Sequence, residues 1–323
     1  MRLWIGFICS ILLFSPLITL SQAIDNTVSF RNINSDTYTR IFYENDFFTG
    51  TDRDYTQGIY IERVTPSLSH FLLSKLLWHP KTDIIKYGIA IEDDGYTPNI
   101  IDKSAIQYGD RPYAGVLFIK TFLTATNTRK RERFSALIST GIIGQSAGGA
   151  VMQKAIHHWI HYTQPLGWPN QIRNDAVLNY QINFEKEIFA YNNNLSFSSY
   201  NSARLGTLST KASAGINAVI GNFYSSFSDN KNLPRKKLQY YFYDQPSVNF
   251  VAYDATLQGG LFNHSSPYTI PEKNINRIVF MNRFGFVLIF KKLYLEYFQS
   301  VNTPEFSTTI AHRSGGIQAG FGF

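Results

Sequence analysis

The stretch Leu178–Glu185, which reads LNYQINFE, alternates apolar and polar side chains without a break. A period of two residues is that of a β-strand, whose successive side chains point to opposite faces. One face of such a strand can contact lipid while the other lines a polar lumen, which is typical of a transmembrane β-barrel. The stretch therefore predicts an all-β chain that crosses a membrane with its strands.

The last residues of the chain repeat the pattern and end on an aromatic side chain. Apolar Ile317, Ala319, Phe321 and Phe323 alternate with Gly316, Gln318, Gly320 and Gly322. A final strand that ends on Phe resembles the terminal signature of bacterial outer-membrane proteins. Further strands are predicted near 37–45, 55–64, 84–93, 113–124, 133–143, 194–202, 206–220, 237–256, 277–290 and 292–301. Together they make about twelve, an even number, as expected for one closed antiparallel barrel whose ends meet.

The composition agrees with a barrel and excludes a helical membrane protein. After the first 23 residues, the longest apolar run, Phe284 to Phe290, has seven residues and includes a glycine, whereas a membrane-spanning helix needs about 20. Aromatic residues make up 15% of the chain and charged residues 16%, against about 25% charged in soluble domains. A transmembrane barrel has this composition because its outer face is apolar only at every second residue.

The first 23 residues are predicted to be a secretory signal peptide. Arg2 supplies the positive start, Leu3 to Leu20 the apolar stretch, and Ser21-Gln22-Ala23 the small residues of a cleavage site. The alternative is an uncleaved anchor, but Ser10 and Pro16 interrupt the apolar stretch. We expect residues 24–323 to form the barrel domain in the outer membrane of a Gram-negative bacterium.

The cysteine content excludes cysteine-dependent chemistry in the barrel domain, and the net charge restricts the partners only loosely. The single cysteine, Cys9, lies in the predicted signal peptide, so the barrel domain has no disulfide, thiolate nucleophile or cysteine-bound metal. The formal net charge of +7 suits a surface that meets anionic lipid or phosphate and specifies neither. No nucleic-acid-binding motif accompanies this charge, and we expect no nucleic-acid partner.

One stretch departs from the strand pattern and predicts a short helix in an extracellular loop. From Ala147 to Tyr162 apolar residues recur at helical spacing, and Pro165 follows to stop the helix. Gln153 and His157 are four apart and share one face of this helix. Histidine is well suited to act as a general base near neutral pH. His158 and His161 lie close by, so spacing alone does not choose among the three, and a single helical histidine is more often structural than catalytic.

Polar residues also concentrate where one predicted strand ends and the next begins. Glu44-Asn45-Asp46 ends the first strand, and Thr51-Asp52-Arg53-Asp54-Tyr55-Thr56-Gln57-Gly58 leads into the second. If Ile41 and Tyr43 face lipid, alternation turns Arg40, Glu44, Asp46, Thr56, Tyr60 and Glu62 inward. Carboxylate, amide and hydroxyl oxygens would then meet at one barrel rim, the donor set that Ca²⁺ prefers. The alternative is an ordinary polar turn with salt bridges.

Two further motifs are weak when taken alone. The loop from Asp93 to Gly115 contains Lys103 and the run GDRPYAG (109–115), and its cations could bind phosphate or an oxyanion, although loops are usually charged. Gly144-Gln145-Ser146-Ala147-Gly148 matches the G-x-S-x-G nucleophile elbow. That elbow works on the parallel sheet of an α/β hydrolase, which this chain has no alternation of strands and helices to build.

Taken together, five ordered motifs resemble the lipid A 3′-O-deacylase family, the outer-membrane enzymes known as LpxR. They are Glu44–Asp46, Thr51–Gly58, Gly109–Gly115, Gly144–His157 and Gly167-Trp168-Pro169-Asn170-Gln171. The C-terminal part agrees only as barrel strands. The resemblance implies a twelve-stranded barrel and Ca²⁺-dependent hydrolysis of the ester-linked acyloxyacyl chain at the 3′ position of lipid A.

The resemblance also assigns roles to single residues. Asn45 and Asp46 match the family's paired metal-site residues, Thr56 its hydroxyl, and Gln153 and His157 its helical pair; Lys103 matches only after a small alignment gap. The implied enzyme is a carboxylic ester hydrolase whose substrate is lipid A in lipopolysaccharide, with Ca²⁺ as cofactor, and we expect a monomer. Two alternatives stay open from the residues alone: an outer-membrane phospholipase with a serine nucleophile, and a porin-like barrel without enzymatic activity.

Overall fold

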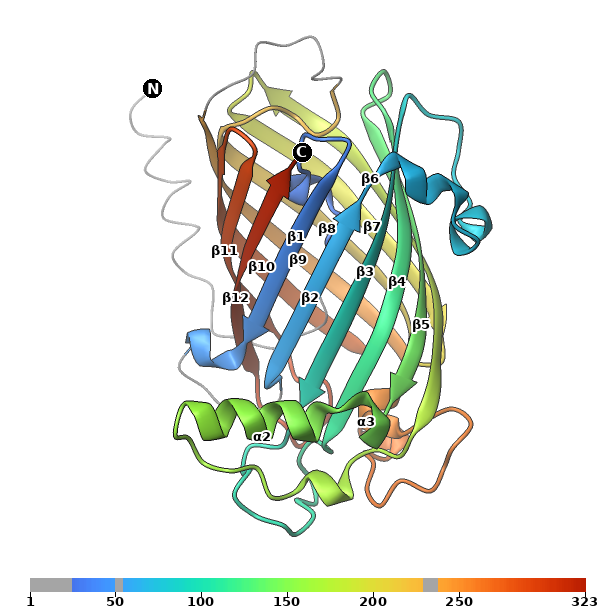
Figure 1. Cartoon of the computed structure of the whole chain (residues 1–323), viewed down its shortest axis with the longest axis vertical. Helices are drawn as coiled ribbons and strands as arrows, with labels where there is room; N and C mark the ends of the chain where they lie inside the picture. The colour runs from blue at the N-terminus through green and yellow to red at the C-terminus, as the bar shows by residue number, and fades with distance from the viewer. Residues whose placement is uncertain (1–24, 50–54, 229–237) are drawn as a thin grey trace.

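The computed structural model describes residues 25–49, 55–228 and 238–323, and shows a closed barrel of twelve antiparallel strands (Figure 1). Each strand pairs with its neighbours in the chain, and β12 closes the barrel on β1, with Tyr38 opposite Gly322. The predicted signal peptide lies outside the described residues. The strands are β1 Tyr38–Asn45, β2 Gln57–Val64, β3 Ile84–Tyr96, β4 Ala114–Asn127, β5 Glu132–Ile143, β6 Asp175–Tyr191, β7 Leu195–Gly206, β8 Ser209–Asn222, β9 Leu238–Asp254, β10 Ile278–Phe290, β11 Leu293–Asn302 and β12 His312–Gly322.

The strands form a barrel because their apolar and polar residues alternate as the sequence predicts. In β6, Leu178 is 58% exposed on the outside, whereas Asn179 is 4% exposed in the lumen. Several strands extend beyond their predicted ends, β6 most of all, because its ladder continues past the alternating stretch on both sides. Within the described residues, no helix has the length and apolar character to cross a membrane.

The remaining elements are short and lie between the strands. The predicted loop helix is confirmed as α2 (Gly149–Trp159), and α3 has a single turn (Ala255–Gln258). In Figure 1, α2 lies along the rim of the barrel at the end opposite the C-terminus. Connections between strands at that end are mostly longer than those at the end with the C-terminus, as is typical of the extracellular side. The short 3₁₀ turns are η1 Ser29–Arg31, η2 Asp46–Thr49, η3 Pro66–His70, η4 Leu73–Leu76, η5 Gln145–Ala147, η6 Trp168–Asn170 and η7 Glu272–Asn274.

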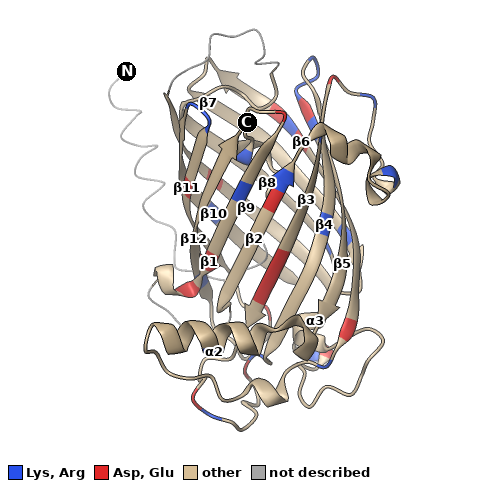
Figure 2. Ribbon diagram, viewed as in Figure 1, with Lys and Arg blue, Asp and Glu red and all other residues tan. Residues whose placement is uncertain are grey.

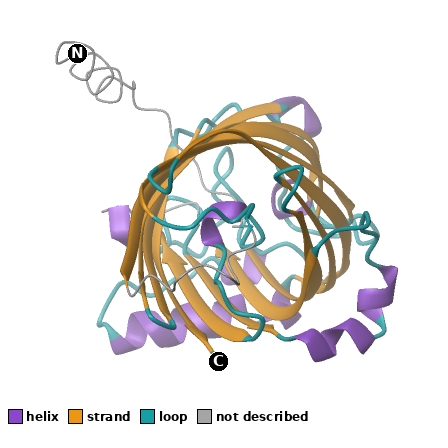
Figure 3. Cartoon of the chain, turned by 90° about the horizontal axis from the view of Figure 1, so that it is seen from above, coloured by secondary structure: helices purple, strands orange, loops and turns teal. Residues whose placement is uncertain are grey.

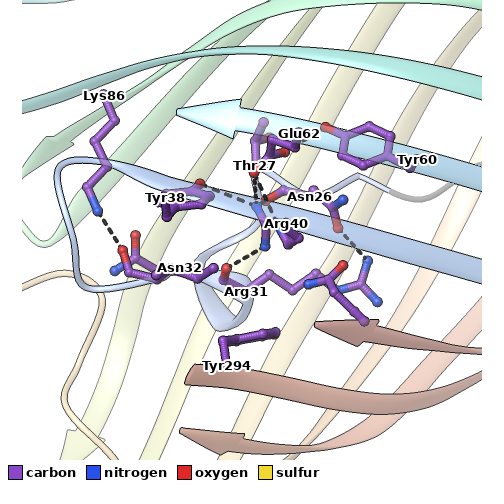
Figure 4. A network of polar contacts seen from close by, with 12 residues as sticks. Asn26, Thr27, Arg31, Asn32, Tyr38, Arg40, Tyr60, Glu62, Lys86 and Tyr294 are labelled. Atoms are coloured by element: carbon purple, nitrogen blue, oxygen red, sulfur yellow. Dashed lines mark hydrogen bonds and ion pairs between the residues drawn. The ribbon is translucent and has the colours of Figure 1, made fainter. Parts of the chain in front are cut away.

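Residues 25–35 turn into the lumen before β1 begins, and we call this segment the N-terminal plug. Arg31 pairs with Glu296 of β11 at 2.6 Å, with both side chains fully buried. Arg40 pairs with Glu62 at 2.5 Å and donates a 2.9 Å hydrogen bond to the Arg31 carbonyl (Figure 4). Because buried charges are costly unless paired, these contacts hold the plug in place, and Figure 3 shows chain inside the ring of strands.

The inward side chains predicted for the first two strands are confirmed. Arg40, Glu44, Thr56, Tyr60 and Glu62 are all buried. Glu44 accepts a hydrogen bond from Ser314 of β12, and Tyr60 donates to Glu62 at 2.6 Å. The acidic run of β3 lies near the end of the barrel where α2 is found (Figure 2). The lumen is therefore lined with polar groups up to the extracellular rim.

Candidate active site

Helix α2 buries polar side chains and exposes apolar ones. It begins after Gly148, whose φ of +86° lies in the left-handed region that favours glycine. Gln153 is 1% exposed and His157 is also buried, whereas Trp159 is 81% exposed. Gln153 and His157 are one turn apart and share the face turned toward β3 and β4. An ordinary surface helix has the opposite arrangement, with its apolar face buried.

Gln153 connects α2 to the barrel wall and to the loop that follows the helix. Its Nε2 donates to Thr56 Oγ1 at 3.0 Å, and its Oε1 accepts from Trp168 Nε1 at 2.6 Å. Thr56 Oγ1 also accepts from Thr97 at 3.3 Å. All four side chains are buried. The amide is thus fixed in one orientation by a donor and an acceptor at a buried position.

His157 is held by the chain just beyond the helix. Its Nδ1 lies 2.5 Å from the carbonyl oxygen of Thr163, and its ring meets the edge of Tyr162 at 5.2 Å. A carbonyl can only accept, so Nδ1 carries the proton and Nε2 is the basic nitrogen of the neutral ring. His158 and His161 are exposed. Burial and orientation therefore single out His157 among the three histidines of this stretch.

Asn45 connects the end of β1 with the start of β2. Its Nδ2 donates to the Thr56 carbonyl at 2.5 Å and to the Tyr43 hydroxyl at 3.1 Å, while its Oδ1 accepts from the Phe47 amide at 2.7 Å. Asp46, the next residue, opens η2 and is buried. The structure thus brings Asn45, Thr56 and Gln153 into one connected group.

The oxygen ligands available at this rim are of the chemical types that a hard cation prefers. Asn45, Asp46 and Thr56 offer amide, carboxylate and hydroxyl oxygens, and Ca²⁺ takes six to eight oxygen ligands in proteins. Residues 25–49, 55–228 and 238–323 contain no group of three or more His, Cys, Asp or Glu side chains placed to hold a metal ion. Asp52 and Asp54 of the same motif lie outside the described residues.

The model of the family described as outer membrane protein LpxR matches residues 7–323. The chain belongs to the LpxR family. It is accordingly an outer-membrane β-barrel, as the sequence predicts. The residues that connect α2 to the barrel lie within the motifs that carry the resemblance to this family.

A solved structure of an LpxR protein agrees with the fold. LpxR from Salmonella typhimurium matches with a TM-score of 0.72 at 21% identity, over 88% of this chain and all of that one. The beta domain of the Bordetella autotransporter Brka matches with a TM-score of 0.47 at 7% identity, over 90% of this chain and 99% of that one. No curated protein matches the chain.

Lys103 stands apart from the other predicted site residues. It is exposed in the connection between β3 and β4. Across the described parts of the chain, no hydrogen bond or ion pair joins it to Asn45, Asp46, Thr56, Gln153 or His157. Its assignment from the LpxR resemblance stays a prediction.

Sequence reasoning did not single out Trp168, although it lies in one of the LpxR-like motifs. Besides its bond to Gln153, its ring packs on Tyr113 at 5.0 Å between centroids. A Cβ added to Gly149 would lie 2.9 Å from the same ring, so only glycine lets the start of α2 approach this closely. Neither tryptophan nor glycine is a residue type that by itself indicates a catalytic site. Only their positions in the LpxR-like motifs could have drawn attention to Trp168 and Gly149.

Arg111 of the GDRPYAG motif fastens the extracellular loops together. It pairs with buried Glu305 in the loop before β12 and donates to Thr256 Oγ1 at 2.7 Å. Its guanidinium lies 4.4 Å over the ring of Tyr96. Burial raises the pKa of Glu305 above its ordinary value, although the Arg111 charge opposes this shift. The motif thus has a structural role that its charge alone does not reveal.

Ser146 lacks the surroundings of a nucleophile. It is exposed, its backbone N–H donates to Asn174 Oδ1 at 2.9 Å, and its Oγ accepts from Asn174 Nδ2 at 2.8 Å. A serine nucleophile needs an adjacent base and an oxyanion hole, and the elbow that supplies them stands on a parallel sheet. Every strand pair of this barrel is antiparallel.

Proposed function

We propose that the protein is a lipid A 3′-O-deacylase that hydrolyses the ester-linked 3′-acyloxyacyl chain of lipid A at the outer leaflet. Membership of the LpxR family supports this activity. The observation that carries the proposal is the arrangement of α2, which turns Gln153 and His157 toward the barrel and Trp159 away from it.

The exposed face of α2 suits a lipid substrate. Val151, Trp159 and Ile160 are apolar and exposed at the extracellular end of the barrel. A helix with aromatic and aliphatic residues on its outer face can lie at a membrane interface. Acyl chains of the substrate then stay in the bilayer while the sugar ester reaches the polar side of the helix. The barrel wall and α2 hold the site at that boundary.

In the proposed mechanism His157 acts as general base. Because Nδ1–H is bound to the Thr163 carbonyl, Nε2 takes a proton from a water molecule as it attacks the ester carbonyl. Collapse of the tetrahedral intermediate breaks the bond to the 3′ oxygen of the sugar, which takes the proton back from His157. The products are a free acid and a 3′ hydroxyl. Gln153 keeps α2 in position against Thr56, so that the base keeps its geometry.

Asn45 and Asp46 are the residues proposed to hold Ca²⁺, which when bound supplies positive charge near the oxyanion of the intermediate. Lys103 is proposed as a second positive charge at the same place. The carboxylate and amide types support the choice of a hard cation.

The two alternatives find less support in the structure. A porin needs an open lumen, whereas here the N-terminal plug spans from β1 to Glu185 of β6 and Glu296 of β11. A serine phospholipase needs an activated serine, and Ser146 has only Asn174 as its polar side-chain partner among the described residues.

Purified protein in detergent micelles with lipid A tests the proposal, with the products read by mass spectrometry. We expect loss of the 3′-acyloxyacyl group and an intact glycerophospholipid in a parallel incubation. Ser146→Ala should keep this activity. Cleavage of glycerophospholipid with lipid A left whole would overturn the proposal in favour of a phospholipase.

A further inference from the structure

The connection between β2 and β3, residues 65–83, is long for the end of the barrel that carries the C-terminus. The turns 128–131, 192–194 and 291–292 at this end have two to four residues, and the connection between β8 and β9, residues 223–237, has fifteen. The connection forms η3 and η4, and in Figure 1 it stands beside the wall of strands. Figure 3 shows that it lies outside the ring.

This connection packs on the lipid-facing side of the wall. Leu77 is buried in one apolar cluster with outward-facing residues of β4 and β5, namely Leu123, Ala125, Phe134, Ala136 and Ile138. The ring of Trp78 meets Phe134 at 5.0 Å, and the Trp78 amide donates to the Tyr180 hydroxyl of β6 at 3.0 Å. The connection therefore covers wall positions where a barrel normally contacts lipid.

The covered positions lie within the membrane rather than beyond it. Leu123 is four residues from the end of β4 at Asn127. With about 3.3 Å per residue and strands tilted about 40°, this places Leu123 roughly 10 Å above the strand end. The apolar outer band reaches the strand ends elsewhere, because Phe290 and Leu293 are exposed on either side of their two-residue turn. The connection thus occupies space that lipid tails would fill.

The side of the connection that faces away from the wall is apolar and basic. Leu72 is 71% exposed and Trp78 64%, and Leu76 is exposed as well. Lys75 and Lys81 are exposed beside them. The one acidic residue of the connection, Asp83, accepts two hydrogen bonds from Thr128, at 2.9 and 2.8 Å. Apolar side chains flanked by lysines match a layer of acyl chains under anionic head groups.

We propose that residues 66–81 form a lipid-binding apron that inserts Leu72, Leu76 and Trp78 into the periplasmic leaflet of the membrane. Lys75 and Lys81 bind the head groups of anionic phospholipids in that leaflet. The apron shields β4 and β5 from lipid and fixes the depth of this side of the barrel. It is separate from the rim that carries α2, since it lies at the opposite end of the strands.

Quenching of Trp78 by bromine-labelled phospholipids in proteoliposomes tests the insertion. Residues 24–323 contain three tryptophans, so Trp159→Phe with Trp168→Phe leaves Trp78 alone. We expect strong quenching when bromine sits in the acyl chain and little quenching by aqueous acrylamide. A matched variant that keeps only Trp168, which is 1% exposed against 64% for Trp78, should show weaker lipid quenching. If the double variant folds poorly, the difference between the wild type and Trp78→Phe reports the same signal.

Energy transfer from Trp78 to labelled lipids tests the head-group preference. We expect at least about threefold more transfer to pyrene-labelled phosphatidylglycerol than to phosphatidylcholine, since both lysines attract anionic head groups at the membrane surface. Lys75→Gln with Lys81→Gln should remove the preference, and Lys154→Gln at the other end should leave it unchanged. Efficient acrylamide quenching of Trp78 would overturn the proposal. Protection from both quenchers together with a dimer in nanodiscs would overturn it in favour of a second copy.

Discussion

Gln153 Nε2 donates a 3.0 Å hydrogen bond to Thr56 Oγ1, and this contact joins helix α2 to the start of strand β2. The same amide accepts from Trp168 Nε1 at 2.6 Å. All three groups are buried, so loss of the amide leaves Trp168 Nε1 without its acceptor, while Thr56 Oγ1 keeps only the 3.3 Å hydrogen bond from Thr97. Each unpaired buried polar group costs about 1–3 kcal/mol.

Gln153→Leu should therefore lower the rate of lipid A deacylation at least about tenfold, the change that about 1.4 kcal/mol produces. The barrel strands should still fold, as a heat-dependent shift in electrophoretic mobility reports. Lys154→Ala, on the exposed side of the same helix, is the matched control and should keep full activity. Full activity of Gln153→Leu would show that the amide does not position the site.

Trp168→Phe is a milder test of the same contact. Phenylalanine keeps a ring against Tyr113 but loses the N–H that Gln153 accepts. A single neutral hydrogen bond contributes about 0.5–1.5 kcal/mol, so activity should fall about two- to tenfold. A change as large as that of Gln153→Leu would point to lost packing instead.

The N-terminal plug should contribute strongly to stability. Glu296→Ala leaves the fully buried Arg31 without its carboxylate, and breaking a buried ion pair costs about 3–5 kcal/mol. We expect a clear drop in the thermal unfolding temperature of the detergent-solubilised protein. Glu132→Ala breaks a half-exposed pair with Lys186 and should change stability by only about 0–1 kcal/mol. Equal effects of the two variants would contradict the assigned role of the plug.

The plug should also keep the barrel from conducting ions. In planar bilayers the wild type should add no steady conductance, and deletion of residues 25–34 should open a channel. The reason is that this segment bonds to strands on opposite sides of the lumen, at Glu185 and Glu296. Steady wild-type conductance would favour the porin alternative.

Removal of calcium tests the proposed cation at Asn45 and Asp46. A chelator should abolish deacylation, and Ca²⁺ added back should restore it. Mg²⁺ should restore little, because it requires a small octahedral site and releases water reluctantly. Asp46→Asn should raise the Ca²⁺ concentration needed for half-maximal activity. Full activity in the chelator would rule out a metal in the mechanism.

The strand pattern was predictable because each strand carries its own signal. Alternation in Leu178–Glu185 reports both faces of β6 locally, and the same holds for the other strands. Strand ends were less predictable, since β6 pairs with β5 as far as Lys186 and continues to Tyr191 through pairing with β7. The helix was visible from its spacing, and its bounds differ from the prediction by a few residues.

The plug and the apron could not be predicted in this way. Arg31 bonds to Glu296, a partner 265 residues away, and nothing near Arg31 in the sequence indicates it. Leu77 likewise lies in one buried cluster with Leu123 of β4, which follows it by 46 residues in the chain. For the site, spacing left His157, His158 and His161 open, and only the fold shows that His157 is buried and oriented. Alternation, helical spacing and the family resemblance pointed to Asn45, Thr56 and Gln153, but their direct bonds needed the structure.

The central claim is that His157 is the general base for lipid A deacylation, and a comparison of two variants tests it most directly. His157→Ala and His158→Ala change neighbouring histidines of α2, one buried and one exposed. Mass spectrometry of lipid A incubated with each folded variant measures loss of the 3′-acyloxyacyl chain. We predict that His157→Ala leaves lipid A whole while His158→Ala cleaves it like the wild type. Cleavage by His157→Ala at the wild-type rate would contradict the proposed mechanism.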